Sequence, residues 1–415
     1  MIAHSPTLAV NEMLDARAAA GETVVHLGFG EARLPVLPEV AEVLAAAAPR
    51  NRYAPVAGST SARTAAAGYF TRRGTPTEPD QVVLAPGSKP LLYALIASLP
   101  GDVVLPRPSW VSYAAQAALA GRRVVAVPAP DGSGGVPDPH LLDAAVRRAQ
   151  AAGRDPGVLV LTLPDNPTGR LAGRDVVARV CEVAGRHGLA VVSDEIYRDL
   201  CYEPADHASP AALLPDRCFV TGGLSKSVAL GGWRIGFARF PDSDLGERAR
   251  RRAIGVASEV WSCLAEPMQA VAAHVLDDPP GVTGYVAAAR RLHRAVTTAL
   301  ADVVVAAGAR CPVPQGAFYA YLDLAPHRAA LARRGVTSGA ALAEQLLSDH
   351  GVGVLPGRAF GDDPAALRVR AAASLLYGRT DDERWAALRS PEPAGLPWIS
   401  DALERVGTAF AALTG

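Results

Sequence analysis

The stretch Thr221–Arg239, TGGLSKSVALGGWRIGFAR, decides how this chain is interpreted. It places Lys226 in a turn rich in glycine and serine, and Arg234 follows eight residues later in a second turn flanked by glycine. Glycines let a backbone approach a ligand closely, and serine and arginine supply hydrogen-bond donors for an anion. A partly desolvated lysine between them can act as a nucleophilic amine. The stretch therefore predicts a site that holds a phosphorylated carbonyl compound covalently.

Two apolar segments upstream of Lys226 are each followed by polar side chains. This pattern favours a binding site around Lys226 over an ordinary surface position for it. Val158–Leu163 is followed by Asn166 in the sequence LPDNPTG, and Ala190–Asp194 is followed by Tyr197 in LAVVSDEIY. Parallel sheets of α/β proteins bind ligands at the carboxyl ends of their strands. We therefore expect these polar side chains to meet at one edge of a sheet.

Apolar runs of strand length alternate with helical stretches from about residue 80 to residue 240. Such alternation is typical of βαβ units with a mostly parallel sheet, and wholly apolar runs indicate a sheet covered on both faces. A long helix is expected from Tyr285 to about Ala307, and the chain from about Cys311 has the pattern of a separate α+β unit. The expected strands of the main sheet are Val82–Ala85, Val103–Pro106, Val124–Pro128, Val158–Leu163, Ala190–Asp194, Cys218–Thr221 and Ile235–Arg239.

Composition limits the class of protein. The chain has 415 residues, which favours two domains, and its 41 basic and 41 acidic residues give no positive field for nucleic acid or a membrane surface. It has no apolar run of about 18 residues, no leader pattern at its N-terminus and no CxxC pair, so we expect a cytoplasmic protein with reduced thiols. It also lacks an HExxH pair or a Cys/His cluster, so no metal site is expected.

Lys226, Arg234, Asn166, Asp194 and Tyr197 together resemble the class I and II aminotransferases. These are the fold-type I enzymes that use pyridoxal 5'-phosphate (PLP). None of the short motifs is decisive alone, but their order and spacing along the chain make the resemblance specific.

The resemblance runs in order over nearly the whole chain, from Gly28-Phe29-Gly30-Glu31 through Tyr53-Ala54-Pro55 and Gly87-Ser88-Lys89 to Arg368. It implies an α/β, fold-type I PLP-transferase architecture, with a mostly parallel seven-stranded sheet in a large domain and a smaller α+β domain. The implied large domain is residues 49–285, and the implied small domain joins residues 1–48 to residues 286–415.

The resemblance also implies roles at the reactive end of the cofactor. Lys226 would form a Schiff base with PLP and move protons, and Asp194 would keep the pyridine nitrogen protonated. Tyr197 and Asn166 would donate hydrogen bonds to the phenolic oxygen of PLP. Trp110 matches the aromatic residue that stacks on the pyridine ring. An ordinary Asn-Pro turn remains an alternative for Asn166, and a core position remains one for Trp110.

The phosphate of PLP would be held at the other end of the site. Arg234 would clamp it in two parallel bonds, and Ser225 would donate its hydroxyl. Gly87-Ser88-Lys89 is expected at the N-terminus of a helix, where backbone amides bind phosphate. Lys89 fits either a cation near the phosphate or a solvated surface residue. The family often carries a hydroxyl residue where this chain has Gly223, so one phosphate contact differs.

Substrate recognition and assembly follow from the remaining matches. Arg368 would bind the substrate carboxylate through its guanidinium fork, and Gly30 would leave room beside it. Arg370 shares the strand face of Arg368, so a slip of two residues would exchange them. Tyr53 matches a tyrosine that reaches the phosphate of a neighbouring subunit, which implies a homodimer with shared active sites. Arg33 is unusual for the family, and we hypothesise that it contacts an acidic or carboxamide substrate side chain, with a surface arginine as the alternative.

The function implied by the resemblance is transfer of an amino group from an L-amino acid to a 2-oxo acid. The same scaffold also supports lyase, decarboxylase, cyclase and oxidase chemistry, because a fold does not fix a function. A DNA-binding regulator of related fold is disfavoured because the chain carries no basic patch.

Overall fold

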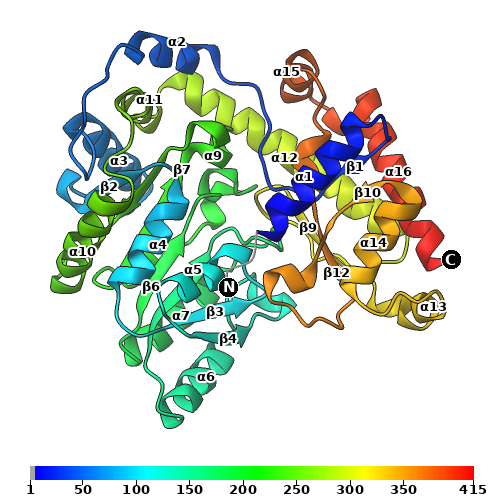
Figure 1. Ribbon diagram of the computed structural model, residues 1–415, viewed down its shortest axis with the longest axis horizontal. Helices are drawn as coiled ribbons and strands as arrows, with labels where there is room; N and C mark the ends of the chain where they lie inside the picture. Colours follow the sequence, from blue (N-terminus) through cyan, green and yellow to red (C-terminus); the bar gives the residue numbers. More distant parts are fainter. Residues whose placement is uncertain (1–4) are drawn as a thin grey trace.

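A seven-stranded sheet forms the centre of the larger part of the chain in the computed structural model, which describes residues 5–415 (Figure 1). Its order is β2-β8-β7-β6-β5-β3-β4, with β8 antiparallel to both neighbours and all other pairs parallel. The strands are β2 Val82–Ala85, β3 Asp102–Arg107, β4 Val124–Pro128, β5 Pro156–Thr162, β6 Ala190–Asp194, β7 Cys218–Gly223 and β8 Gly236–Arg239. The predicted mostly parallel sheet is confirmed, with only small differences at the strand ends.

Alternate residues of the strands pack into two separate apolar clusters, one on each face of the sheet. Along β5, Leu159 and Leu161 belong to one cluster, whereas Val158 and Val160 belong to the other. Because both faces are covered by helices, every strand position can be apolar, which explains the continuous apolar runs. The helices over the Val158 face are α4 Ser88–Ser98, α5 Val111–Leu119 and α10 Asp244–Val260; those over the opposite face include α3 Thr60–Arg72, α6 Pro139–Ala151 and α7 Arg174–Arg186.

The C-terminal part of the chain forms a second α+β unit around a three-stranded antiparallel sheet. Its strands are β9 Tyr319–Asp323, β11 Leu355–Pro356 and β12 Arg368–Ala372, in the order β11-β12-β9. Near the N-terminus, β1 Val25–His26 pairs in parallel with β10 Val352–Gly353. This pairing joins the N-terminal segment to the C-terminal unit.

The long helix α12, Pro280–Ala306, begins five residues before the predicted start at Tyr285 and runs toward the C-terminal unit (Figure 1). Proline at the first turn of a helix lacks an N–H that would have no partner there, so Pro280 starts the helix rather than breaking it. The other helices are α1 Pro6–Ala19, α2 Pro38–Ala47, α8 Pro210–Leu213, α9 Leu224–Ser227, α11 Glu266–Leu276, α13 Arg328–Arg333, α14 Gly339–His350, α15 Asp381–Arg389 and α16 Pro397–Thr414. Among residues 5–415, none of the helices combines the length and the apolar character needed to cross a bilayer.

The register of three neighbouring strands places polar residues side by side at one edge of the main sheet. Thr162, the last residue of β5, lies opposite Asp194, the last residue of β6, and Asp194 lies opposite Thr221 of β7. Since all three strands are parallel, their carboxyl ends share this edge. Asp194 therefore lies beside other polar side chains at the carboxyl edge of the sheet, as expected, and the candidate site lies at this edge.

Candidate active site

A cavity of about 450 Å³ opens at this edge of the sheet and is lined by residues from both parts of the chain. Ten residues predicted from the sequence line it: Gly30, Ser88, Lys89, Trp110, Asn166, Asp194, Tyr197, Ser225, Lys226 and Arg234. The other lining residues are Thr7, Leu8, Phe29, Glu31, Tyr113, Thr162, Ile196, Gly231, Tyr319 and Arg370. The other predicted site residues, Gly87, Tyr53 and Arg368, are not among those that line it.

Lys226 lies in the single-turn helix α9, directly after β7, and its side chain points into the cavity. Its Nζ donates a hydrogen bond to the carbonyl oxygen of Gly30 at 2.5 Å. Removal of the ammonium from water lowers the pKa of Lys226 to about 8; Glu31 opposes this change, whereas nearby cations such as Arg370 add to it. Near neutral pH the uncharged, nucleophilic form of the amine is therefore much more populated than in an ordinary lysine, although it is still the minor form.

Asp194 is a buried carboxylate whose hydrogen-bonding side chains are hydroxyls. Tyr113 donates to its Oδ2 at 2.8 Å, and Thr221 donates to its Oδ1 at 3.1 Å. Burial raises the pKa of Asp194 to about 6, and these hydroxyls offset only part of that rise. A buried carboxylate with neutral partners favours a cationic N–H on a ligand. The protonated ring nitrogen of PLP has this character, so Asp194 fits the cofactor.

A chain of polar groups leads from Asn166 across the cavity. Asn166 Nδ2 donates to the Tyr197 hydroxyl at 3.4 Å, and the Tyr197 and Tyr319 hydroxyls lie 2.7 Å apart. Arg370 Nη1 donates to Asn166 Oδ1 at 3.3 Å, and its Nη2 donates to the carbonyl oxygen of Gly28 at 2.6 Å. Together these contacts connect the expected partner of the phenolic oxygen, Tyr197, to a buried arginine.

Arg370 is 1 % exposed, and its Nε has no hydrogen-bond partner within residues 5–415. Its guanidinium carbon lies 4.8 Å from the centre of the Tyr319 ring and 5.1 Å from that of Phe360. Aromatic faces hold a cation in place without neutralising it. A buried guanidinium with an unused N–H that borders a cavity fits the carboxylate of a small ligand.

The prediction that Arg368 binds the substrate carboxylate is corrected, because Arg370 lines the cavity instead. Arg368 Nε lies 3.2 Å from Asp323 Oδ2, and its Nη1 lies 3.2 Å from Asp362 Oδ2. The positive charge of Arg368, the first residue of β12, is therefore already paired with two carboxylates. Both arginines share one face of the strand, so the sequence pattern alone could not separate them.

Arg33 does not line the cavity of its own chain, so the hypothesis that it contacts the substrate gains no support there. Arg33 is exposed and borders a different groove, next to residues such as Glu22 and His26. Its backbone has a φ of 43°, a left-handed conformation that turns the chain between Glu31 and Leu34.

The end of the cavity that contains Arg234 and the N-terminus of α4 has the character of an anion site. Gly87 caps α4 with a φ of 93°, so the Ser88 and Lys89 amides belong to the first turn of an eleven-residue helix. A Cβ atom on Gly87 would lie 2.2 Å from Arg234 Nη2, so glycine is required for the arginine to reach this end. Helix N-termini and guanidinium groups both attract phosphate. The arrangement therefore fits the phosphate of PLP, with Ser225 also lining the cavity.

Trp110 caps the N-terminus of α5 and packs edge-on against Tyr113, with ring centres 5.2 Å apart. Lys89 Nζ lies 5.3 Å from the centre of the Trp110 ring. Desolvation, and then the charge of Arg234, lower the pKa of Lys89. The Trp110 ring therefore contacts both the Lys89 cation and the ring of Tyr113, whose hydroxyl donates to Asp194.

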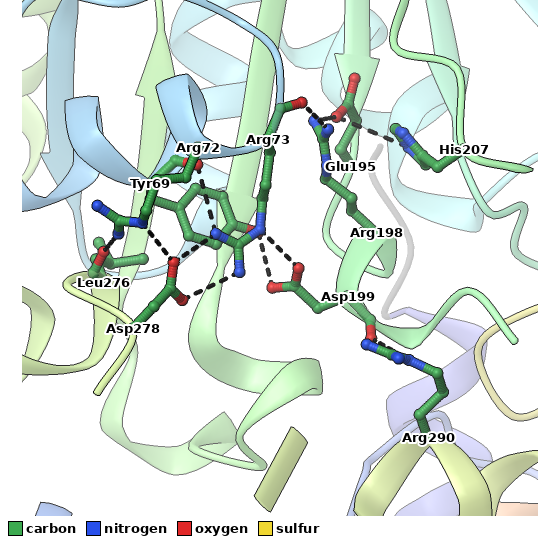
Figure 2. Close-up of polar contacts among 10 residues, drawn as sticks. All are labelled: Tyr69, Arg72, Arg73, Glu195, Arg198, Asp199, His207, Leu276, Asp278 and Arg290. Atoms are coloured by element: carbon green, nitrogen blue, oxygen red, sulfur yellow. Dashed lines mark hydrogen bonds and ion pairs between the residues drawn. The ribbon is translucent and has the colours of Figure 1, made fainter. Parts of the chain in front are cut away.

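The segment after Asp194 is held from behind by a network of charged side chains (Figure 2). Glu195 points away from the cavity, as expected for the next residue of a strand, and Arg198 Nη1 donates to its Oε2 at 2.8 Å. Ser209 donates to Glu195 Oε1, and the His207 Nε2 atom lies 3.8 Å from Oε2. Arg198 also donates to the carbonyl oxygen of Arg73.

Arg73, just after α3, is the centre of this network (Figure 2). Its Nε lies 2.8 Å from Asp199 Oδ1, and its Nη1 lies 2.7 Å from Asp278 Oδ2. The guanidinium carbon also stacks 3.6 Å from the centre of the Tyr69 ring, and the Tyr69 hydroxyl donates to Asp199 at 2.8 Å. The network therefore connects α3, the turn before α12 and the segment that carries Asp194 and Tyr197.

Several lining residues were missed by the sequence prediction, although some carried a signal. Thr162 is the last residue of the observed strand β5 and the last but one of the predicted strand, so the strand-end rule that selected Asp194 could have included it. Tyr113 lies three residues after Trp110 and hence on the same side of α5. Tyr319 and Arg370 come from strands of the C-terminal unit, and nothing in the local sequence shows that these strands pack against the main sheet.

Comparison with known proteins agrees with this geometry. Residues 22–375 match the family model described as aminotransferase class I and II. The chain is 34% identical over 373 residues to the aspartate/prephenate aminotransferase of Cereibacter sphaeroides, covering 87% of this chain and 90% of that one. It is 31% identical over 362 residues to the aspartate/prephenate aminotransferase of Thermus thermophilus, covering 86% and 89%.

Solved structures give the same result. The aspartate aminotransferase from Thermus thermophilus with maleate superposes with a TM-score of 0.83 at 29% identity, covering 99% of this chain and 97% of that one. The chain therefore belongs to the class I and II aminotransferases, enzymes that transfer amino groups. The fold-type I architecture and the membership expected from the sequence are confirmed, and PLP is the cofactor that this family implies.

The network behind Asp194 predicts an unequal effect of two neighbouring arginine substitutions on stability. Arg73→Met leaves two partly buried carboxylates without their shared cation and should lower the free energy of unfolding by about 3 kcal/mol. Arg72→Met removes an ion pair to the same Asp278 from a side chain that is 41% exposed, and should cost less than about 1 kcal/mol. Urea unfolding compares the two variants, and equal losses would show that Arg73 is not the centre of the network.

The lowered pKa of Lys226 predicts how capture of PLP by the cofactor-free protein depends on pH. An amine with a pKa of about 8 is uncharged at lower pH than an ordinary lysine of pKa 10.5. The capture rate, divided by that of a model lysine derivative, should therefore be highest below pH 8 and fall by about tenfold per pH unit above it. The measurement is the appearance of the visible absorbance band. A ratio that stays constant from pH 7 to pH 10 would contradict the pKa of Lys226.

Proposed function

We propose that this chain transfers the amino group of an acidic L-amino acid to a 2-oxo acid, with PLP bound through Lys226. The observation that carries the proposal is the convergence of three groups in one cavity: an amine of lowered pKa, a buried carboxylate with neutral partners, and a buried guanidinium with an unused N–H. The first two groups suit the cofactor, and the third suits the carboxylate of the substrate.

When bound, PLP supplies a ring that accepts electrons from the substrate carbon next to the amino group. The buried carboxylate of Asp194 would keep a proton on the ring nitrogen, and Tyr197 and Asn166 would donate toward the phenolic oxygen. Lys226 Nζ would hold the cofactor and, when free, would be the base that accepts the proton from the substrate Cα and later gives a proton back. Arg370 holds the substrate carboxylate so that this Cα–H lies within reach of Lys226.

The preference for an acidic donor rests on the cations of the cavity. Arg234 is proposed to hold the phosphate and Arg370 the α-carboxylate, which leaves Lys89 free to pair with a second carboxylate. Relatives of the chain are named aspartate or aspartate/prephenate aminotransferases, and one solved relative is described with maleate, a dicarboxylate. A dicarboxylic amino acid such as aspartate or glutamate is therefore the proposed donor.

We further propose a homodimer in which Tyr53 reaches the phosphate site of the partner subunit. Tyr53 is 91% exposed in the single chain, although it carries a large aromatic ring. It stands where the family resemblance implies a tyrosine that crosses to the neighbouring subunit. Burial of this ring against a second copy would explain an otherwise solvent-exposed aromatic residue.

The half-reaction tests the function directly. Aspartate or glutamate added without an acceptor should abolish the visible band of the Lys226-bound cofactor and release one equivalent of 2-oxo acid per site. Lys226→Ala should show neither change. Release of ammonia, carbon dioxide or peroxide in place of the 2-oxo acid would assign the protein to lyase, decarboxylase or oxidase chemistry instead.

The two arginines of β12 provide a matched pair for the carboxylate site. Arg370→Lys replaces a bidentate fork by a point charge in a buried position and should raise the KM for amino donors by about 30-fold. Arg368→Lys alters an ion pair outside the cavity and should change KM by less than about threefold. Steady-state kinetics with one donor distinguish them. A larger effect of Arg368→Lys would restore the original assignment.

Lys89→Met tests the choice of donor. Loss of a charged hydrogen bond to the second carboxylate should lower kcat/KM for aspartate by about 10- to 100-fold, but change kcat/KM for alanine by less than about threefold. The ratio of the two values in wild type and variant is the measurement. An equal loss for both donors would mean that Lys89 acts on the phosphate of the cofactor.

A further inference from the structure

Tyr319, the first residue of β9, places a hydroxyl group beside the residues that surround the reactive end of the cavity. It is 1 % exposed, and its hydroxyl lies 2.7 Å from that of Tyr197. A Cβ atom on Gly30 would lie 2.3 Å from the Tyr319 hydroxyl, so the absence of a side chain at position 30 leaves the space that this hydroxyl fills. The carbonyl of the same glycine accepts the hydrogen bond from Lys226.

The Tyr319 ring is held firmly enough for its hydroxyl to have a fixed direction. The ring centre lies 4.7 Å from that of Phe318 and 5.6 Å from that of Tyr197, which it meets edge-on. The guanidinium of Arg370 covers the ring at 4.8 Å. On the backbone, Tyr319 pairs with Ala372 of β12. These contacts leave the ring little freedom to rotate away from Tyr197.

A count of protons gives the direction of the hydrogen bond between the two tyrosines. Burial raises the pKa of both phenols, so each keeps its single proton. A phenol donates one hydrogen bond and accepts others. Asn166 already donates to Tyr197. If Tyr197 donates its own proton to a ligand in the cavity, Tyr319 must be the donor in the 2.7 Å contact between the hydroxyls.

We propose that Tyr319 is a positioning residue for amino-group transfer: its hydroxyl donates to Tyr197 and thereby directs the Tyr197 proton toward the phenolic oxygen of the cofactor. A hydroxyl that accepts a hydrogen bond becomes a better donor, because chains of hydrogen bonds polarise one another. Tyr319 acts through Tyr197 and does not itself need to touch the cofactor. This inference rests on the proposed binding of PLP through Lys226.

The substitution Tyr319→Phe tests the inference because it removes only the hydroxyl and keeps the ring beneath Arg370. Without the donated bond, Tyr197 stabilises a negative phenolic oxygen less well. The pH at which the visible band of the Lys226-bound cofactor changes should therefore rise by about 0.5 to 1 unit. In the same variant kcat should fall about three- to tenfold, with the KM for the amino donor changed by less than about twofold.

Tyr321→Phe is the matched control on the same strand. Tyr321 is also buried, and its hydroxyl donates to Asp362 at 2.8 Å, but it does not line the cavity. Its loss should leave the pH midpoint of the visible band unchanged. An unchanged midpoint in Tyr319→Phe, or equal shifts in both variants, would overturn the proposal.

A double substitution shows whether Tyr319 acts through Tyr197. In a Tyr197→Phe background, removal of the Tyr319 hydroxyl should produce no further shift of the midpoint, because the acceptor of its hydrogen bond is gone. A further shift as large as that in the wild-type background would overturn the proposal. Failure of the proposed binding of PLP through Lys226 is recognised separately, since wild-type protein would then show no visible band with PLP at all.

Discussion

The position of one buried carboxylate constrains the rest of the site. Asp194 ends β6 between Thr162 and Thr221, and it is satisfied by hydroxyls rather than by a cation. A carboxylate in this position is costly unless a positive group arrives from the cavity. The elements around it agree with this requirement: the Tyr113 hydroxyl fixes one oxygen, and the Arg73 network holds the following segment from behind.

The cationic side chains of the cavity are divided between its two ends. Arg234 and the N-terminus of α4 lie together at one end, where Gly87 gives the guanidinium room. Arg370 lies toward the other, within a polar chain through Asn166 to Tyr197. Lys226 lies between the main sheet and the loop of Gly30. A ligand with a phosphate at one end and a reactive carbonyl at the other matches this arrangement, and a carboxylate on its second reactant completes it.

Much of this arrangement could be predicted from the sequence, because the residues concerned follow strands of a parallel sheet or lie in glycine-rich turns. The features predicted in this way include all seven strands of the sheet and ten of the residues that line the cavity. The misassignment of Arg368 has a different origin. Arg368 and Arg370 lie on one face of β12, and they differ only in their distance from the main sheet, which the sequence does not show. Tyr319 escaped prediction for the same reason, since its role depends on packing between two parts of the chain. Arg33 has a left-handed backbone and borders a different groove, and no local signal in the sequence indicated either feature.

The most direct test of the account is the protonation state of the cofactor beside Asp194. Nitrogen-15 NMR of the protein loaded with PLP labelled at the ring nitrogen reports this state. The ring nitrogen should be protonated in the wild-type protein at pH 8 and unprotonated in Asp194→Asn, in which kcat should also fall by about 10²- to 10³-fold. An unprotonated nitrogen in the wild-type protein, or the same spectrum for both proteins, would contradict the central role of Asp194.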